Sequence, residues 1–216
     1  MSLIQLRGIS SFSLGEDRYD LKLETIMFLM KTFNINYFRI AMLADGNKGY
    51  INNYKLKDKV EEIIKYALEL DIYCIVDWHI YYDGNPLKNL EQAKDFFDDI
   101  SRKYSKYNNI IYEICNEPHE DATWNDVIEP YANEIIKVIR SYDKDNVIIV
   151  GTPNWSNDVD RVKMIDVNNL MYTFHFYPSG DDEKDISNIK KMENAIQRQI
   201  PVFVTEYGVG DAYGKK

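Results

Sequence analysis

The chain has 216 residues, 45% of them hydrophobic, which is enough to bury one sizeable core, and we expect a single domain over residues 1–216. Its formal net charge of −9 leaves no cationic stripe for phosphate groups, so nucleic acid and anionic membrane surfaces are poor partners. No apolar run reaches the ~20 residues that span a bilayer, and the N-terminal segment lacks the basic and apolar regions of a signal peptide. A neutral polymer suits this surface better.

Short β-branched runs alternate with longer amphipathic segments along the whole chain, a pattern typical of βα units and a parallel sheet. We expect seven strands, over residues 3–9, 37–42, 72–78, 110–115, 147–151, 170–175 and 202–205. Apolar residues at helical spacing predict helices near 23–30, 60–67, 93–104, 124–142 and 186–196. One βα unit about every 30 residues predicts an α/β fold, a TIM-type (β/α)8 barrel, although an open doubly wound sheet would show the same pattern.

Chemically reactive side chains gather where the expected strands end, and this distribution favours a barrel. These strand ends carry Arg39, His79, Asn116, Glu117, Trp155, His175, Tyr177 and Glu206. In a barrel all of them meet at one face, which is where barrel enzymes hold their catalytic groups. The first expected strand runs out with the single glycine Gly8 and no phosphate-binding glycine pattern, so a nucleotide-binding sheet is not expected.

Two glutamates at these strand ends suit the hydrolysis of a glycosidic bond. With retention of configuration, that reaction needs one carboxylic acid to protonate the leaving oxygen and one carboxylate to attack the anomeric carbon, about 5 Å apart. Glu117 precedes Pro118, which cannot extend a central strand, so its carboxyl should stand at the barrel rim. Glu206 ends the last apolar run. Taken singly, each could be a solvated glutamate after a strand, but together with the other polar strand ends they indicate a catalytic pair.

Two segments around these glutamates resemble the signatures of glycoside hydrolase family five, the cellulase family A. They are IYEICNEP at residues 111–118 and FVTEYG at residues 203–208. The likeness extends to residues 6–11, 38–42, 75–79, 83–86, 150–153 and 175–177, in the family's order and over nearly the whole chain. The chain is most similar to the bacterial endoglucanases of that family.

The resemblance implies a secreted, retaining endo-β-1,4-glucanase (a cellulase) that hydrolyses β-glucan polysaccharide or cello-oligosaccharides by double displacement, without a cofactor. Position by position, it makes Glu117 the general acid/base and Glu206 the nucleophile. The other site residues then hold the nucleophile or the sugar: Arg39 and Tyr177 hydrogen-bond Glu206, Asn116 holds the sugar 2-hydroxyl, and His79 and His175 line the cleavage subsite. A cation and a phenol donor near Glu206 would favour its ionised form.

Several other residues have both a structural and a functional interpretation. Trp155 follows the fifth strand in a polar loop and is expected to contact sugar, whereas Trp78 is expected to pack in the core. Glu113 has the strand parity that points into the barrel, where a carboxylate needs a partner such as Arg7 or Arg39. We interpret Glu113 as structural.

The histidines and cysteines predict neither a metal site nor a disulfide framework. The three histidines lack the spacing of metal ligands, so no metal ion is expected, and His119 is interpreted as an exposed loop residue. Cys74 and Cys115 lie in apolar runs and are expected to be free buried thiols.

The sequence departs from the family pattern in two places. After residue 206 it indicates a loop, so the family's eighth strand and helix, with the tryptophan that floors the cleavage subsite, have no counterpart. We expect a C-terminally incomplete barrel with open edges on its first and last strands, exposed apolar helix faces and weakened activity. Three alternatives stay open: the chain is a fragment, it self-associates through these edges, or the fold tolerates the gap. Phe12 stands where the family commonly has a histidine and cannot hydrogen-bond a sugar hydroxyl.

Two other functions stay open at the level of sequence. A mannanase or xyloglucanase of the same fold would keep both glutamates and change the walls of the groove. An incomplete barrel could instead be a catalytically weak or inactive glucan-binding fragment, although the presence of both glutamates argues against a dedicated binding module.

Overall fold

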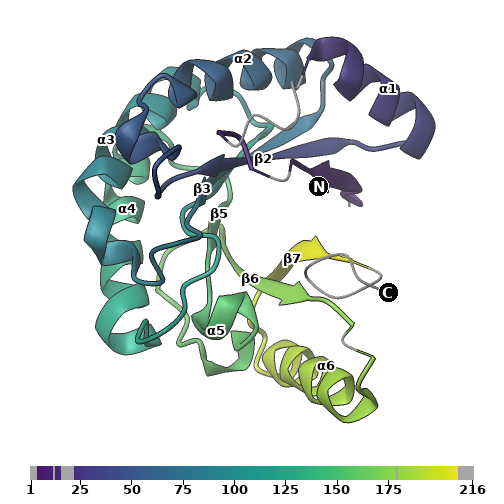
Figure 1. Cartoon of the computed structure of the whole chain (residues 1–216), viewed down its shortest axis with the longest axis vertical. Helices are drawn as coiled ribbons and strands as arrows, with labels where there is room; N and C mark the ends of the chain where they lie inside the picture. Colours follow the sequence, from purple (N-terminus) through teal and green to yellow (C-terminus); the bar gives the residue numbers. More distant parts are fainter. Residues whose placement is uncertain (1–3, 12, 16–21, 179, 209–216) are drawn as a thin grey trace.

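The computed structural model describes residues 4–11, 13–15, 22–178 and 180–208, in which strands and helices alternate (Figure 1). The strands are β1 (Gly8–Ser10), β2 (Tyr37–Leu43), β3 (Tyr73–His79), β4 (Ile110–Glu113), β5 (Ile148–Val150), β6 (Leu170–Phe176) and β7 (Val202–Tyr207). The helices are α1 (Leu23–Phe33), α2 (Leu56–Glu69), α3 (Leu90–Tyr104), α4 (Glu129–Tyr142), α5 (Pro153–Ser156) and α6 (Asp182–Gln197). Short 3₁₀ turns cover Tyr50–Asn52, Pro86–Asn89 and Val159–Arg161, and a π-helical turn, Trp124–Ile128, precedes α4.

The strands are parallel and pair in chain order from β1 to β7. Figure 1 shows them curling into a nearly closed barrel with the helices on its outside. The seven-stranded TIM-type barrel predicted from the sequence is therefore confirmed. An open doubly wound sheet is ruled out, because its strand order would reverse at a switch point and this order does not.

Most elements lie close to their predicted bounds, and the differences are at the barrel's irregular places. The first strand was predicted wrongly: it begins at Gly8 and ends at Ser10, because only these residues form a ladder with β2. The short helix α5 was not expected, since Asn154 and Trp155 inside it have left-handed backbone angles that no hydrophobic periodicity reveals.

The inside of the barrel has an apolar floor beneath a charged layer. The floor is a cluster of four buried residues, Tyr37, Ile75, Ile111 and Ile149. Residues two positions further along a strand point to the same side. On β2, β3 and β4 these are the fully buried Arg39, Asp77 and Glu113. The strand register thus places the first charges of the site directly on apolar side chains that exclude water.

The layer between strands and helices holds the residues that were expected to be structural. Trp78 is fully buried there and packs against Phe96 and Phe97, so its predicted role in the core is confirmed. Cys74 and Cys115 are free and buried, as expected.

A gap separates β1 from β7, because in the described sheet β1 pairs with β2 and β7 pairs with β6 (Figure 1). A groove of about 640 Å³ runs between the two edges and is lined by residues of both, and neither Glu117 nor Glu206 lines it. Apolar side chains of the flanking helices are exposed, among them Met27 and Phe28 on α1 and Ile186 on α6. The open edges and exposed helix faces are as expected, and self-association through them stays a prediction. No helix within the described ranges has the length and apolar character of a bilayer-spanning segment.

Candidate active site

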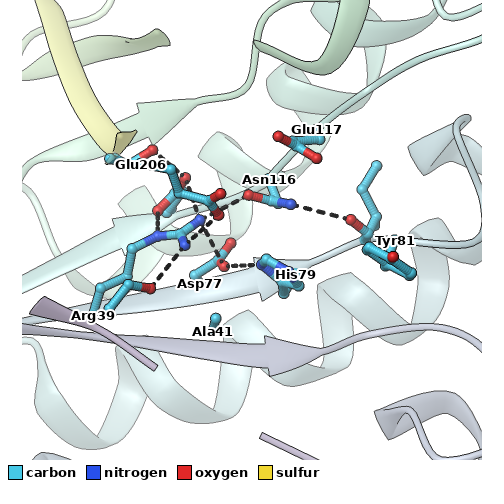
Figure 2. Close-up of polar contacts among 12 residues, drawn as sticks. Arg39, Ala41, Asp77, His79, Tyr81, Asn116, Glu117 and Glu206 are labelled. Atoms are coloured by element: carbon cyan, nitrogen blue, oxygen red, sulfur yellow. Dashed lines mark hydrogen bonds and ion pairs between the residues drawn. The ribbon is translucent and has the colours of Figure 1, made fainter. Parts of the chain in front are cut away.

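Glu117 and Glu206 meet at the end of the barrel where the strands finish. Glu117 follows β4, between Asn116 and Pro118, and Glu206 lies near the end of β7 (Figure 2). One carboxyl oxygen of each and a ring nitrogen of His175 all lie within 4.8 Å of one another. The two carboxylate side chains keep 20% and 17% of their surface exposed, so a ligand can reach both.

Glu206 points into the barrel because β7 is irregular just before it. Phe203 and Thr205 share one strand parity, so a regular strand would turn Glu206 outward. In the ladder with β6, Thr173 pairs with Phe203 and His175 pairs with Glu206. These pairs are two residues apart on β6 but three residues apart on β7, so β7 has one extra residue there. This extra residue turns both Thr205 and Glu206 toward the site.

Arg39 binds most of the acidic groups of the site and is fully buried (Figure 2). Its Nε and Nη2 donate to the two carboxyl oxygens of Glu113 at 2.6 and 3.0 Å, and its Nη1 donates to Glu206 Oε1 at 2.7 Å. Nη2 also lies 2.9 Å from Asp77 Oδ2. Burial lowers the pKa of Arg39, but Asp77, Glu113 and Glu206 raise it by more, so the guanidinium is a fixed cation.

The buried Glu113 points into the barrel, as its parity predicted. Its partner is Arg39 and not Arg7, whose Nη1 lies 3.4 Å from Gln5 Oε1. Burial raises the pKa of Glu113, and Arg39 opposes that shift by binding both oxygens. The pair is a buried structural ion pair beneath Glu117 and Glu206.

Replacing Arg39 with methionine is expected to lower the free energy of unfolding by about 3–5 kcal/mol, since it leaves buried carboxylates without their cation. Urea denaturation followed by circular dichroism measures this loss. Arg102→Met is the matched control, because the Arg102 side chain is 53% exposed and its ion pairs contribute little. An equal loss of stability in both variants would contradict this description of Arg39.

Glu206 is held in its ionised form by its neighbours. Tyr177 donates its hydroxyl to Oε2 at 2.9 Å and Arg39 binds Oε1, so both hydrogen bonds that the resemblance implied are present. Burial raises the pKa of Glu206, but His175, Arg39 and His79, with the Tyr177 hydrogen bond, lower it to well below the usual range. The carboxylate is therefore charged and partly desolvated, as a nucleophile needs to be.

His175 lies between the two glutamates and links them. Its Nδ1 is 2.7 Å from Glu117 Oε1 and 3.8 Å from Glu206 Oε2, and the residue is only 3% exposed. Burial lowers the pKa of His175, but Glu206 and Glu117 raise it by more. Glu117 thus has an imidazole as its partner, whereas Glu206 has a guanidinium and a phenol.

His79 and Asn116 complete the buried wall beside Arg39 (Figure 2). His79 Nδ1 lies 2.7 Å from Asp77 Oδ2, and although burial lowers the pKa of His79, Asp77 raises it by more. The Asn116 side chain accepts from Arg39 Nη2 at 2.8 Å and donates to the Ile80 carbonyl at 3.3 Å. An amide nitrogen carries two hydrogens, and among the described residues the Asn116 amide donates one of them, to Ile80.

Trp155 lies in α5, a short segment of strained backbone that contacts Pro118, the residue after Glu117. Asn154, Trp155 and Ser156 have left-handed φ angles of 58°, 54° and 57°, and the Trp155 N–H donates to the Pro118 carbonyl at 3.0 Å. Its indole is 51% exposed and stacks on the His119 ring at 5.0 Å. The interpretation of His119 as an exposed loop residue is wrong, because this ring is half-buried between Trp155 and its own Nδ1 contact with the Glu117 carbonyl at 2.7 Å.

The sequence profile described as Cellulase (glycosyl hydrolase family 5) matches residues 2–216. The chain belongs to glycoside hydrolase family 5. Its curated relatives include an endoglucanase of Clostridium saccharobutylicum, 42% identical over 98% of this chain and 47% of the relative. Endoglucanase A of Butyrivibrio fibrisolvens is 41% identical over 98% of this chain and 49% of the relative. The chain therefore spans about half the length of the curated relatives it matches.

Solved family 5 structures share the fold. The catalytic domain of Thermobifida fusca endoglucanase Cel5A superposes with a TM-score of 0.88 at 32% identity, covering 99% of this chain and 71% of that one. A structure described as cellulase Cel5C_n gives a TM-score of 0.88 at 37% identity, covering 99% of this chain and 68% of that one. The barrel of this family 5 chain is therefore that of its relatives over the part that they share.

Two buried residues that contact the site, Asp77 and Thr205, were not predicted as site residues. Asp77 holds His79, and Thr205 contacts both His175 and Glu113. The signal for Asp77 was its strand parity, two residues before His79, but Thr205 becomes visible only with the bulge in β7. The prediction about Phe12 lies outside the described residues.

Glu117, His175 and Glu206 are the group in the described ranges whose ligand atoms could surround a metal ion. Each of them already has a partner of opposite charge or a hydrogen bond within the site. These contacts explain why the three side chains lie close together without a metal ion. The absence of a metal cofactor stays a prediction.

Proposed function

We propose that this chain is the catalytic domain of a retaining endo-β-1,4-glucanase, with Glu117 as general acid/base and Glu206 as nucleophile. The observation that carries the proposal is the approach of the two carboxyl groups to within 4.8 Å. Retaining glycosidases hold their carboxyl groups about 5–5.5 Å apart, whereas inverting enzymes leave room for a water molecule between them. A shorter separation therefore supports direct attack by Glu206 on the anomeric carbon.

The two carboxyl environments match the two chemical roles. In the first step the Glu206 oxygen bonds to the anomeric carbon while Glu117 gives its proton to the departing glycosidic oxygen. In the second step Glu117 removes a proton from water, whose oxygen displaces Glu206 from that carbon. Arg39 and Tyr177 keep Glu206 charged before the first step and stabilise it as the leaving group in the second.

The surrounding residues are placed to bind glucose units. The second amide hydrogen of Asn116 can donate to the sugar 2-hydroxyl, and His79 and His175 line the same subsite beside Glu206. The exposed indole of Trp155, in the segment that contacts Pro118, offers a flat apolar surface to a glucose ring on the leaving-group side. These roles follow the resemblance and fit the contacts described above.

The substrate class rests on the relatives. Curated proteins about 40% identical are named endoglucanases, and a related catalytic domain with 32% identity was solved in complex with cellotetraose. We infer β-1,4-glucan as the substrate polymer and secretion as the natural location, in keeping with the acidic surface of this chain.

Release of reducing ends from carboxymethylcellulose and from mannan tests this assignment. We expect hydrolysis of the cellulose derivative, with a fast fall in viscosity because cleavage occurs within the polymer, and little release from mannan. Faster hydrolysis of mannan would make the chain a mannanase. Binding of cello-oligosaccharide without any release would favour the alternative that the open barrel between β1 and β7 is an inactive glucan-binding fragment.

A further inference from the structure

The hydroxyl group of Thr205 connects the buried ion pair of Arg39 and Glu113 with His175 and Glu117. It is 4% exposed and has three polar partners: Thr173 Oγ1, His175 Nε2 at 2.9 Å and Glu113 Oε1 at 3.0 Å. Of these partners, Glu113 also binds Arg39, and His175 also contacts Glu117. A continuous chain of hydrogen bonds therefore runs from the buried ion pair to the proposed acid/base.

The number of hydrogens that each group in this hydrogen-bond network can donate fixes the direction of each bond. A threonine hydroxyl has one hydrogen to donate and two lone pairs to accept with. Both oxygens of Glu113 accept from Arg39, the geometry of an ionised carboxylate, so the Thr205 hydrogen goes to Glu113. Toward His175, Thr205 can then only accept, and the Nε2 of His175 must carry a hydrogen.

The consequence lies at the opposite edge of the imidazole ring. With Nε2 protonated, the 2.7 Å contact between His175 Nδ1 and Glu117 Oε1 contains one proton. That proton belongs either to Glu117, donating to a neutral ring, or to His175, donating to a carboxylate. If it leaves, a carboxylate faces a nitrogen lone pair at hydrogen-bond distance, which is unfavourable.

We propose that Thr205 is a positioning residue that fixes the Nε2–H tautomer of His175. In that tautomer the hydrogen bond between His175 Nδ1 and Glu117 contains one proton, which Glu117 can give to the substrate. This inference rests on the proposed function of Glu117. During glycosylation the shared proton moves to the glycosidic oxygen as its bond to the anomeric carbon breaks and the bond to Glu206 forms. The carboxylate left facing the Nδ1 lone pair then draws a proton from the attacking water, which restores the pair.

The charged groups around His175 come from several strands, and all of them stay in place when the hydroxyl of Thr205 is removed. They are Glu117 after β4, Glu113 on β4, Arg39 on β2 and Glu206 on β7. Without the hydroxyl, nothing holds the hydrogen at Nε2, so the neutral ring can place it at Nδ1 and donate to the Glu117 carboxylate. That stabilises the deprotonated pair, and the alkaline limb of activity moves to lower pH.

The test is the pH dependence of kcat/KM for Thr205→Val, measured with cello-oligosaccharide and with a dinitrophenyl cellobioside, whose leaving group needs no acid. We expect the alkaline limb for the oligosaccharide to shift down by about one pH unit, a tenfold loss on that limb. The limb for the dinitrophenyl substrate should move much less. Thr205→Ser, which keeps the hydroxyl, should restore the limb, and Thr173→Val controls for the loss of a buried hydroxyl in the same layer.

If the alkaline limb of kcat/KM does not shift in Thr205→Val, the proposal is overturned. An equal shift in Thr173→Val, or a shifted limb in Thr205→Ser, overturns it as well. If Thr205→Val does not fold, ¹⁵N NMR of the histidine-labelled wild-type protein decides, with three histidines to assign. A hydrogen on His175 Nε2 supports the proposal, and its absence overturns it. Glu117→Ala separates the two proposals: intact glucan hydrolysis in that variant would refute the role of Glu117 itself.

Discussion

Replacing Glu206 with glycine is expected to lower kcat on cello-oligosaccharides by about 10⁴- to 10⁶-fold, the scale on which enzymes lose activity with their central catalytic group. The variant removes the charged carboxylate that Arg39 and Tyr177 bind and that we propose as the nucleophile. Azide should restore turnover of an activated aryl cellobioside, because the small anion fits where the carboxylate was. Since azide then attacks from the nucleophile's side in a single step, the product should be the α-glycosyl azide.

Chromatography and NMR of the azide product measure this outcome. A thermal melt close to that of the wild type is the control, because Glu206 also contributes to the charge balance around Arg39. Rescue of the Glu117 position with an α-product, and not of the Glu206 position, would reverse the assignment of the two residues.

Replacing Glu117 with alanine is expected to lower kcat/KM on cello-oligosaccharides by about 10²- to 10⁴-fold, the usual contribution of a general acid. The loss should be much smaller for a dinitrophenyl cellobioside, whose leaving group departs without protonation. Azide should accelerate the second step by replacing the water that Glu117 no longer activates, and the product should be the β-glycosyl azide.

Asp121→Asn is the matched control for this variant, because Asp121 is an exposed acidic residue in the same loop as Glu117. Steady-state kinetics on both substrates give the comparison. An equal loss on the two substrates would mean that Glu117 acts on binding or folding and not as the acid.

The strand ends could be predicted from sequence because a parallel barrel brings them together whatever the details of packing. Glu117 and Glu206 needed only their positions at the ends of apolar runs, and Arg39 its position within one, to be recognised as one group. Thr205 could not be recognised, because its role depends on a one-residue bulge in β7 that no alternation of polar and apolar residues reveals.

The backbone conformation around Trp155, in α5, could not be predicted from the sequence for a similar reason. The left-handed backbone at Trp155 is stabilised by a hydrogen bond to Pro118 and by stacking on His119, and both are contacts between segments distant in the chain. The sequence read locally therefore predicted a polar loop at Trp155, where the structure has the short helix α5, and an exposed His119, which is half-buried. Irregular backbone at a site is set by tertiary contacts, and only coordinates show it.

The gap between β1 and β7 leaves the charged layer of the site intact. Arg39, Glu113 and Asp77 rest on the apolar floor of the strands β2, β3 and β4, away from the open edges. Glu206 lies on the edge strand β7, yet it is fixed by Arg39 on β2 and by Tyr177 just after β6. The proposed catalytic pair is thus held by residues that the described barrel already contains.

The anomeric configuration of the first sugar released tests the central claim most directly, because it reports whether Glu206 attacks the sugar itself. ¹H NMR during the first minutes of cello-oligosaccharide hydrolysis distinguishes the anomers before they interconvert. The close approach of Glu117 and Glu206 predicts that the β-anomer forms first and that the α-anomer appears only later by mutarotation. Initial formation of the α-anomer would contradict the double displacement and the assignment of Glu206 as nucleophile.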